Sequence, residues 1–526
     1  MRTALRPMFA LAALAVAARL PFLISGKIPF DSDEAVEGLM ARHLLNGELP
    51  AFLWGQAFKG VPEVYLAAGA FSAFGSSVGV LKGVTLALFA AFVALQFVLL
   101  DKIASRWVAV AASALLIAAP PTLVFWSLDA SAEYVWVMLL GTTLVLVASG
   151  RTRRPAAAGF LVGLGLWVHQ LILVYLIPLA VQLVAGSEWW RRRDFGKPRA
   201  AALVLGAIAV FYLALAAVAF TTGGFALDVG GIEMGVRAPQ KMARIAAAVA
   251  GLALVVHLLA TTTRAGIRQF AQAHWPAAAG FLVGYLPAIL YSLLVEPARS
   301  PARNANLRQL VEAAPDILGN IVPIVAGFKM ATTERLAIPL VAALPGAAAL
   351  AAYVWSTRRA LATSFFPLFV VWVPFLFIAG GAYLDTQSYR YLVPWYAGLA
   401  VAWSGGSLAL AGGRRTIATV IVASIVLVHG WQQVVWYRRL QPDVQSPALI
   451  ECLTRNGIRG GYAEYWTSYK LTFLAGEAII IAPSDGVDRY PRYTDFVRSL
   501  PPEERLEDAA LCDATRASPE SGRKVR

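Results

Sequence analysis

The chain has few charged residues, and this scarcity excludes an ordinary soluble fold. Asp, Glu, Lys and Arg make up only 14% of its 526 residues, whereas hydrophobic residues make up 58%. A soluble domain carries about 25% charged residues, because these side chains cover its water-facing surface. A chain this apolar cannot cover such a surface. Its mean hydropathy of +0.63 is typical of a membrane protein.

Cysteine is also scarce. The only two, Cys452 and Cys512, both fall in the polar C-terminal tail, and two cysteines do not make a zinc framework. If the tail lies on the outer, oxidising side of a membrane, we expect these residues to form a disulfide. This disulfide would join the loose end of the tail to its core.

Long apolar runs recur along the chain, and each can cross a hydrocarbon layer of roughly 30 Å. Backbone amides in lipid need internal partners, so these runs are expected to be helices. The first run could imitate a signal peptide, but Arg19 and Pro21 interrupt its end and no small-residue cleavage site is evident. The predicted fold class is an all-α polytopic membrane bundle of about 13 transmembrane helices, at 8–25, 80–100, 107–126, 133–149, 156–168, 171–186, 201–220, 243–261, 276–294, 336–355, 364–381, 393–411 and 416–436. The short runs 156–168 and 171–186 are interpreted as a tight hairpin with its tip near His169.

The basic residues predict the orientation of this bundle. They lie in short clusters between the apolar runs, which is the positive-inside pattern of a membrane protein and not evidence for a nucleic-acid partner. The N-terminus is therefore expected in the cytoplasm and the C-terminal tail outside, for a multi-pass protein of the cell inner membrane. Only three acids fall in the proposed inner segments: Asp101, Glu188 and Asp194.

Two domains are expected. Residues 1–436 form the transmembrane domain, whose first outer loop (26–79) is long, acidic and aromatic, with an apolar helix at 62–76 lying at the interface. Residues 437–526 form a small extracytoplasmic α/β domain. In this domain, strands at Gly461–Glu464 and Ala478–Ala482 flank a helix at Trp466–Leu474. The stretch after about Pro501 is charged and expected to be partly disordered.

Acidic residues gather in the first outer loop, in the sequence Asp31-Ser32-Asp33-Glu34 followed by Glu37. One interpretation is structural: Asp31 and Glu34 fit a capping box, and acids favour the positive end of a helix. The other is catalytic, because carboxylates beside the outer membrane surface can act on a lipid-linked substrate. On this second interpretation Asp33 and Glu34 are the catalytic candidates.

Two further segments contain candidate residues. Tyr389 and Arg390 stand at the outer end of a span, where arginine's planar fork of donors matches a phosphate; an interfacial aromatic belt is the alternative. Asp129 and Glu133 are four residues apart in another outer turn and can share a helix face. They are a candidate second acidic site, or alternatively a solvated helix start.

These motifs together resemble the GT-C superfamily of lipid-linked glycosyltransferases, with the protein O-mannosyltransferases and the lipid A aminoarabinose transferase as the nearest relatives. The acidic pair after the first span matches Asp33-Glu34, and the resemblance implies that Asp33 is the catalytic base. Residues 388–394 look like the superfamily's Arg-Tyr-Leu-x-Pro signature. The chain departs where the aminoarabinose transferase has Glu-Lys-Pro-Pro, although Lys59 matches the lysine.

The function expected from these residues is transfer of a sugar from a polyprenyl-phosphate donor to an acceptor hydroxyl of a lipid, glycan or protein. Asp33 is the predicted general base, with inversion at the anomeric carbon, and Lys59, Tyr389 and Arg390 are predicted to bind the donor phosphate. No cofactor is implied with certainty, and a divalent metal is left open. The alternatives are a transporter or flippase of a lipid-linked solute and an oligosaccharide ligase. A transporter would need ionisable groups inside the spans, and the apolar runs hold almost none at depth.

Overall fold

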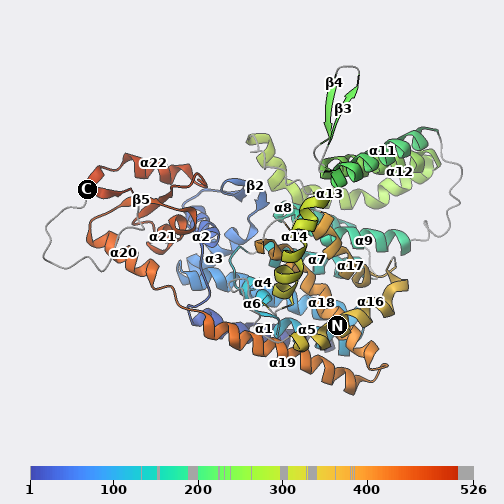
Figure 1. Cartoon of the computed structure of the whole chain (residues 1–526), viewed down its shortest axis with the longest axis horizontal. Coiled ribbons are helices and arrows are strands. Elements are labelled where there is room, and N and C mark those ends of the chain that lie inside the picture. The colour runs from blue at the N-terminus through green and yellow to red at the C-terminus, as the bar shows by residue number, and fades with distance from the viewer. Residues whose placement is uncertain are drawn as a thin grey trace.

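The protein is described here by a computed structural model, which is mostly helical (Figure 1). It describes residues 2–131, 133–150, 154–186, 200–222, 225–229, 232–236, 239–261, 264–295, 306–326, 329, 340–361, 363–379, 381, 383 and 386–507. In the view of Figure 1, the C-terminal segments lie on the left, beside the helices and strands of the first outer loop. The remaining helices fill the centre and right.

Each of the 13 predicted runs contains a helix. The helices of these runs are α1 (Arg2–Ile24), α4 (Val78–Ile103), α5 (Arg106–Ile117), α6 (Pro121–Trp126), α7 (Glu133–Ala148), α8 (Pro155–Val168), α9 (Leu173–Gly186), α11 (Ala200–Thr222), α12 (Pro239–Thr261), α13 (Arg264–Leu294), α16 (Leu344–Thr357), α17 (Phe365–Ala379), α18 (Tyr396–Leu410) and α19 (Arg415–Arg439). Shorter elements connect them: η1 (Gln170–Ile172), β3 (Phe225–Val229), β4 (Ile232–Val236), α14 (Leu307–Asp316), η2 (Ile317–Ile321), α15 (Val322–Val325), η3 (Leu340–Ala343), η4 (Arg358–Ala360) and η5 (Thr386–Trp395).

Several of these helices are long and apolar enough to cross a membrane, so the chain is a multi-pass membrane protein. Among the residues that the structure describes, four qualify by length and composition: Leu5–Ile24, Val78–Ile103, His274–Leu294 and Arg415–Arg439. A fifth candidate is the pair Val341–Ala360 and Phe365–Ala379, which is bent by 115°. The other predicted spans correspond to shorter apolar helices, and the number of 13 crossings stays a prediction.

Three predicted spans differ from the structure. The run 107–126 is not one helix, because Pro120 and Pro121 lack backbone N–H groups and the chain breaks there into α5 and α6. The first three residues of the run 393–411 belong to the 3-10 helix η5, so the α-helix α18 begins only at Tyr396. The tight hairpin is also wrong, because α8 and α9 do not pack closely against each other.

Helix α8 packs instead against α13, and glycine makes this contact possible. A Cβ at Gly159 would lie 1.9 Å from the carbonyl oxygen of Ala277, and one at Gly284 would lie 2.2 Å from that of Phe160. Small residues let helix backbones approach this closely in membranes. The glycines at the contact are Gly159 and Gly163 of α8 and Gly280 and Gly284 of α13.

The first outer loop contains two helices and a hairpin. Helix α2 (Ser32–Leu45) and helix α3 (Pro62–Phe74) match the predicted helices, and Asn46 is the C-cap of α2. The antiparallel hairpin of β1 (Phe52–Leu53) and β2 (Gln56–Gly60) was not predicted, because its strands are too short to show an alternating pattern. It places Lys59 near the end of β2.

The C-terminal unit contains the predicted strand–helix–strand arrangement. Strands β5 (Gly460–Ala463) and β6 (Ile480–Pro483) are parallel and are connected by α21 (Tyr465–Leu474). At the start of the charged end, β7 (Arg505–Leu506) adds a third strand beside β5; the rest of this stretch, from residue 508, lies outside the described residues, and its partial disorder stays a prediction. The other elements of the unit are α20 (Gln445–Arg455), α22 (Pro491–Ser499) and η6 (Pro502–Glu504). Cys452 is buried in α20, whereas Cys512 lies outside the described residues, so the disulfide stays a prediction.

The C-terminal unit and the first outer loop share one hydrophobic core. Leu39 and Met40 of α2 and Val64 of α3 are fully buried in the same cluster as Tyr469 and Phe473 of α21. The closest contact is at Gly38, where a Cβ would lie 2.5 Å from Cε2 of Phe473. The packing therefore places the beginning of α2 directly beside the C-terminal unit.

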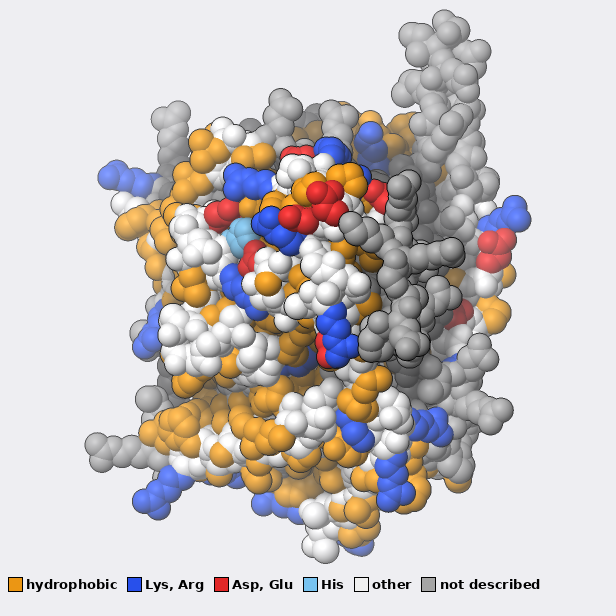
Figure 2. Space-filling view, turned by 90° about the vertical axis from the view of Figure 1, so that its left-hand side faces the viewer, with side chains coloured by type: hydrophobic (Ala, Val, Ile, Leu, Met, Phe, Trp, Pro, Cys, Tyr) orange, Lys and Arg blue, Asp and Glu red, His pale blue; other side chains and the backbone are white. Residues whose placement is uncertain are grey.

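Charged side chains are distributed unequally on this side of the molecule. In Figure 2 the acidic side chains lie in the upper half, together with basic ones, whereas hydrophobic side chains dominate the lower half and basic ones lie along its bottom edge. This pattern is the one expected if the lower edge faces the cytoplasm.

The two ends of α19 provide a test of the predicted orientation. We expect a cysteine replacing Thr416 to label only from the cytoplasmic side and one replacing Val444, which is 70% exposed, to label only from the outside. The measurement is labelling with a membrane-impermeant maleimide in intact and in opened cells, with Cys452 and Cys512 replaced by serine. Labelling of both positions from the same side would contradict the orientation.

Candidate active site

A cavity of about 950 Å³ lies where the first outer loop, the turn between α6 and α7, η5 and the C-terminal unit meet. Among the described catalytic and donor-binding candidates of the sequence analysis, Glu34 is absent from its lining. The candidates that line it are Asp33, Lys59, Asp129, Glu133, Tyr389 and Arg390. Residues from three separate parts of the sequence therefore meet in one place, including the pair proposed as a second acidic site.

Asp33 lies in the first turn of α2, and its side chain is 30% exposed. Its Oδ1 atom accepts a hydrogen bond from the hydroxyl of Tyr465 and lies 3.9 Å from Nη2 of Arg489. The other carboxylate oxygen, Oδ2, has no partner among the residues that the structure describes. The carboxylate is thus fixed at one oxygen and open at the other.

Asp31 and Glu34 have structural contacts. Asp31 is the N-cap of α2, and its Oδ1 accepts a hydrogen bond from the backbone N–H of Glu34 at 3.1 Å. The predicted capping box is only half formed, because Glu34 points away and accepts hydrogen bonds from Lys82 Nζ and the backbone N–H of Ala130. Burial raises the pKa of Glu34 to about 7, although the Lys82 ammonium opposes this shift. Glu34 is 1% exposed and does not line the cavity.

Lys59 is buried between two carboxylates. Its Nζ atom lies 2.9 Å from Oε1 of Glu37 and 2.8 Å from Oε2 of Glu133. Burial alone would lower the pKa of Lys59, but these two acids outweigh it and raise the pKa well above its ordinary value. The lysine is therefore charged, and its charge is already balanced by protein groups.

Arg390 differs from Lys59, because no ion-pair partner for it exists within the described ranges. Its guanidinium carbon lies 5.5 Å from the ring centroid of Tyr391, and its buried Nε atom makes no hydrogen bond. Tyr389, next to it, is 5% exposed and lies near Trp126. Arg390 is thus a cation with hydrogen-bonding capacity left over at the cavity.

Asp129 and Glu133 line the same cavity but do not share a helix face. Asp129 lies in the turn after α6, where its Oδ1 accepts a hydrogen bond from the backbone N–H of Ser131, and Glu133 is the first residue of α7. Burial, with Glu34 and Asp31 nearby, raises the pKa of Asp129 well above its ordinary value. This shift favours the protonated form of Asp129 more than in a solvent-exposed aspartate.

Contacts that the sequence did not predict surround the candidate residues. Tyr465 and Arg489 come from the C-terminal unit, more than 400 residues from Asp33, and only the fold brings them together. Lys82 had a sequence signal, because a lysine inside an apolar run needs a buried counter-charge. Glu63 of α3 is 2% exposed and accepts a hydrogen bond from Thr85, and burial raises its pKa well above its ordinary value.

The described residues contain no group of three or more His, Cys, Asp or Glu side chains placed to hold a metal ion. The acids at the cavity instead have other partners: Glu133 pairs with Lys59 and Asp33 with Tyr465. A divalent metal therefore remains open, as it did from the sequence.

A second cavity, of about 990 Å³, adjoins the first. Its lining is mainly apolar and includes Trp167 of α8, Leu290 and Leu294 of α13, and Trp54 of the hairpin. Leu53 and Arg489 line both cavities. The two spaces therefore meet next to the residues that hold Asp33.

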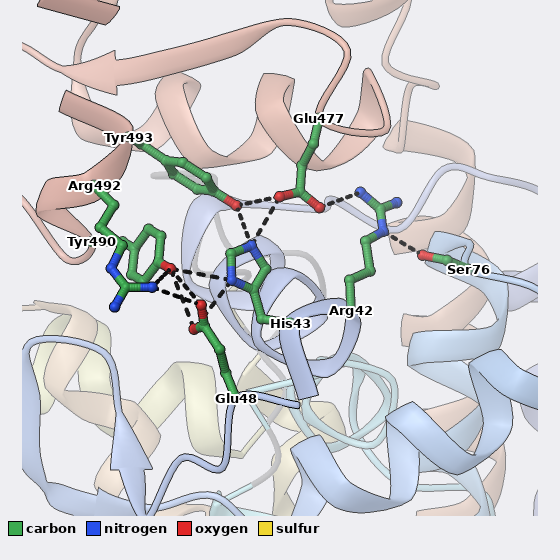
Figure 3. Close-up of polar contacts among 8 residues, drawn as sticks. All are labelled: Arg42, His43, Glu48, Ser76, Glu477, Tyr490, Arg492 and Tyr493. Atoms are coloured by element: carbon green, nitrogen blue, oxygen red, sulfur yellow. Dashed lines mark hydrogen bonds and ion pairs between the residues drawn. The ribbon is translucent and has the colours of Figure 1, made fainter. Parts of the chain in front are cut away.

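At the edge of the second cavity, His43 connects α2 to the C-terminal unit (Figure 3). Its Nε2 atom lies 2.9 Å from Oε1 of Glu477 and 3.0 Å from the hydroxyl of Tyr493, and its Nδ1 atom lies 3.2 Å from Oε2 of Glu48. Other polar groups complete the cluster: Tyr490 and Arg492 contact Glu48, and Arg42 contacts Glu477 and Ser76.

The charge on His43 matters for this contact. Burial alone would lower the pKa of His43, but the hydrogen bonds to Glu477 and Glu48 outweigh it and raise the pKa. Burial would likewise raise the pKa of Glu477, yet the hydrogen bonds from His43 and Tyr493 lower it. The cluster thus favours a protonated histidine beside an ionised glutamate.

Neither protein-family models nor curated proteins match the chain. Among solved structures, it is similar to the Archaeoglobus fulgidus oligosaccharyltransferase in complex with Zn and sulfate, at 15% identity and a TM-score of 0.47, over 90% of this chain and 62% of that one. It is also similar to ArnT from Cupriavidus metallidurans in the apo state, at 11% identity and a TM-score of 0.49, over 94% of this chain and 89% of that one. For the same ArnT bound to undecaprenyl phosphate the TM-score is 0.31.

These structure neighbours are GT-C glycosyltransferases, the superfamily that the sequence motifs resemble. The chain spans less than two thirds of the oligosaccharyltransferase's length. With identities of 11–15% and TM-scores below 0.5, no residue role passes from these proteins to this chain. The function has to be argued from the site itself.

The His43 cluster predicts a pH dependence of stability. Because its pKa is raised, His43 stabilises the folded protein fully below its unfolded pKa of about 6.5, and this contribution is lost as the pH rises through the folded value. Glu477 has a lowered pKa, so it stabilises the folded protein fully above its unfolded pKa of about 4.3. This stabilisation is lost as the pH falls through the pKa of Glu477 in the folded protein. The melting temperature of the wild type should therefore exceed that of His43→Gln by the most between about pH 5 and 6.5, by on the order of a degree or two.

This difference should shrink toward pH 9. The control is Asp495→Asn, an exposed acid of the same unit, whose effect should not change between pH 6 and 9. A difference for His43→Gln that stays constant over this range would mean that the charge on His43 does not contribute to the contact.

Proposed function

We propose that the chain is an inverting membrane glycosyltransferase that moves a sugar from a polyprenyl-phosphate donor to an acceptor hydroxyl on the outer face of the membrane. The observation that supports this most is the cavity of about 950 Å³, in which a half-open carboxylate, Asp33, and a cation with no ion-pair partner among the described residues, Arg390, occur together. Both sit on segments that the charge pattern predicts to be outside.

The reaction needs few protein groups. The acceptor oxygen attacks the anomeric carbon, and Asp33 takes the hydroxyl proton as general base. The bond between the anomeric carbon and the phosphate oxygen breaks, and the electron pair leaves with the lipid phosphate. Because this leaving group is already an anion of low basicity, no general acid is required. Displacement in one step inverts the anomeric carbon.

Arg390 is the first choice for the donor phosphate. Its fork of N–H donors can bind two phosphate oxygens, and stabilising the charge that develops on the phosphate lowers the barrier. Tyr389 adds an aromatic wall next to it. Lys59 contributes less directly, because Glu37 and Glu133 already balance its charge. Its role in this proposal is to offset the charges of these two carboxylates and to hold the hairpin beside α2.

The contacts of the buried charges favour an enzyme over a transporter. Arg19 in α1 donates hydrogen bonds to Ser127 and to the backbone oxygens of Ile117 and Leu116, and Lys82 in α4 pairs with Glu34. Both are permanently partnered groups that join helices, and neither lines the cavity. An oligosaccharide ligase remains a variant of the same chemistry with a larger donor.

Replacement of Asp33 tests the proposal. Asp33→Asn keeps the size of the side chain but removes the base, so transfer should fall by at least about 100-fold. The measurement is transfer of radiolabelled sugar from the native lipid carriers to acceptors in cell membranes, with protein level and melting temperature recorded. Asp31→Asn is the matched control, because asparagine is an equally good helix N-cap and should leave the rate near wild type.

Glu34→Gln should instead lower the melting temperature, because it leaves Lys82 buried without a counter-charge, a change that typically costs about 3–5 kcal/mol. Wild-type transfer by a folded Asp33→Asn protein would rule out the general-base role. It would make a transporter the better interpretation.

Arg390→Ala should weaken turnover or donor binding by roughly 10- to 100-fold, since a charge-assisted hydrogen bond contributes about 1.5–3 kcal/mol. Arg390→Lys should recover only part of this, because the planar fork is lost. Arg308→Gln removes an exposed arginine that pairs with Glu312 and should have no effect. Unchanged donor kinetics in folded Arg390→Ala would remove this residue from the site.

A further inference from the structure

We infer that Tyr465 and Arg489 of the C-terminal unit are positioning residues for Asp33: they hold Oδ1 of its carboxylate so that Oδ2 faces the acceptor hydroxyl. This inference rests on the proposed function and deepens it. It means that the C-terminal unit completes the catalytic centre and is not merely attached to it.

Tyr465 is well placed to hold the carboxylate. It is the first residue of α21, it is 4% exposed, and its hydroxyl donates to Oδ1 of Asp33. Two contacts restrain this residue: its backbone N–H donates to Asp485 at 3.0 Å, and its ring packs against that of Tyr469. A tyrosine restrained in this way cannot turn its hydroxyl away from Asp33 without moving the helix.

Arg489 holds the same oxygen from a second direction. Its Nη2 atom lies 3.9 Å from Oδ1 of Asp33, and its Nε atom donates to the hydroxyl of Tyr465 at 3.3 Å. With the amide of Gln56 turned to present its oxygen, that oxygen accepts from both Nη atoms at 2.8 and 2.6 Å. One guanidinium thus connects the hairpin, α2 and α21.

The backbone around Arg489 is fixed as well. The hydroxyl of Tyr469 accepts hydrogen bonds from the N–H groups of Arg489 and Tyr490, at 2.7 and 3.0 Å. On the hairpin side, a Cβ at Gly55 would lie 3.1 Å from Cδ of Arg489, so the side chain passes close over this glycine. The side chain is only 15% exposed although it lines both cavities.

The chemical consequence concerns which oxygen acts as the base. Oδ1 already accepts the Tyr465 hydroxyl and lies 3.9 Å from the Arg489 guanidinium, so a proton arriving there would displace the hydrogen bond and weaken the ion pair. Oδ2 has no partner among the described residues, so it is the oxygen that can approach the acceptor hydroxyl and take its proton. Fixing the carboxylate in one orientation supplies the alignment that a general base needs within hydrogen-bond reach of the proton.

The experiment uses the full-length protein and the membrane transfer assay described above. Tyr465→Phe removes only the hydroxyl, and Arg489→Lys keeps the charge but loses the fork. We expect each to lower kcat by roughly tenfold with the donor KM unchanged. Loss of donors to a carboxylate disfavours its charged form, so the acid limb of the pH–rate profile should move to higher pH. Arg498→Gln, an exposed arginine of the same unit, is the control and should change neither.

A second measurement does not need the donor. In a double-mutant cycle of melting temperatures, Tyr465→Phe and Asp33→Ala should be non-additive, because each removes the hydrogen bond between the two side chains. Additive effects would overturn the contact on which the inference rests.

The outcomes separate the inference from the proposed function. If Asp33→Asn is inactive while Tyr465→Phe and Arg489→Lys keep the wild-type kcat and pH profile, the positioning role is wrong and the proposed function stands. If Asp33→Asn is as active as the wild type, the proposed function fails, and the positioning role fails with it. A lower kcat with a displaced acid limb in both variants supports the inference.

Discussion

Lys82 carries a charge into an otherwise apolar helix, and Glu34 of α2 supplies its counter-charge. The pair is almost completely buried, with side-chain exposures of 3% and 1%, so separating the two groups would leave a charge in an apolar environment. This contact fixes α2 from the side of the membrane helices. On the other side, Gly38 lets α2 approach Phe473 of the C-terminal unit. The position of Asp33 depends on both contacts, since it is one residue from Glu34.

The sequence predicted the elements of the site better than their partners. Helix α2, its N-cap Asp31 and the strand–helix–strand of the tail follow from local patterns, because capping and alternation act over a few residues. The resemblance to GT-C enzymes, and not a local pattern, singled out Asp33 as the base and Lys59 as a phosphate ligand; the fold places both beside one cavity with Arg390. The sequence patterns did not predict where the apolar runs are interrupted or where the short strands lie. Pro120 and Pro121 divide an apolar run that hydropathy reads as continuous, and the β1–β2 hairpin is too short to leave a pattern. Arg489 could not have been assigned to Asp33, because nothing in a sequence pairs residues 456 positions apart.

Some charged side chains at the cavity are fully paired with other protein groups, whereas others are paired only in part or not at all by described residues. Lys59 is compensated twice, by Glu37 and Glu133, and so contributes to the fold as much as to any ligand. Arg390 is compensated by no described residue, and Asp33 is compensated at one oxygen only. Side chains with hydrogen-bonding atoms that have no partner can bind a ligand directly. Side chains that are already paired would first have to give up an existing contact. Burial also raises the pKa of Asp129, which lines the cavity, and this favours its uncharged form and limits the negative charge there.

The glycines between α8 and α13 have a mechanical consequence. Because glycine lets the two backbones touch at these positions, the helix pair has little room to shift by rearranging side chains there. Trp167 stands at the end of α8, where its indole N–H donates to the backbone oxygen of Ala51 and where a Cβ at Gly60 would lie 2.5 Å from its carbonyl oxygen. The position of the hairpin that carries Lys59 is therefore tied to the packing of α8 against α13, two helices far from the hairpin in the sequence.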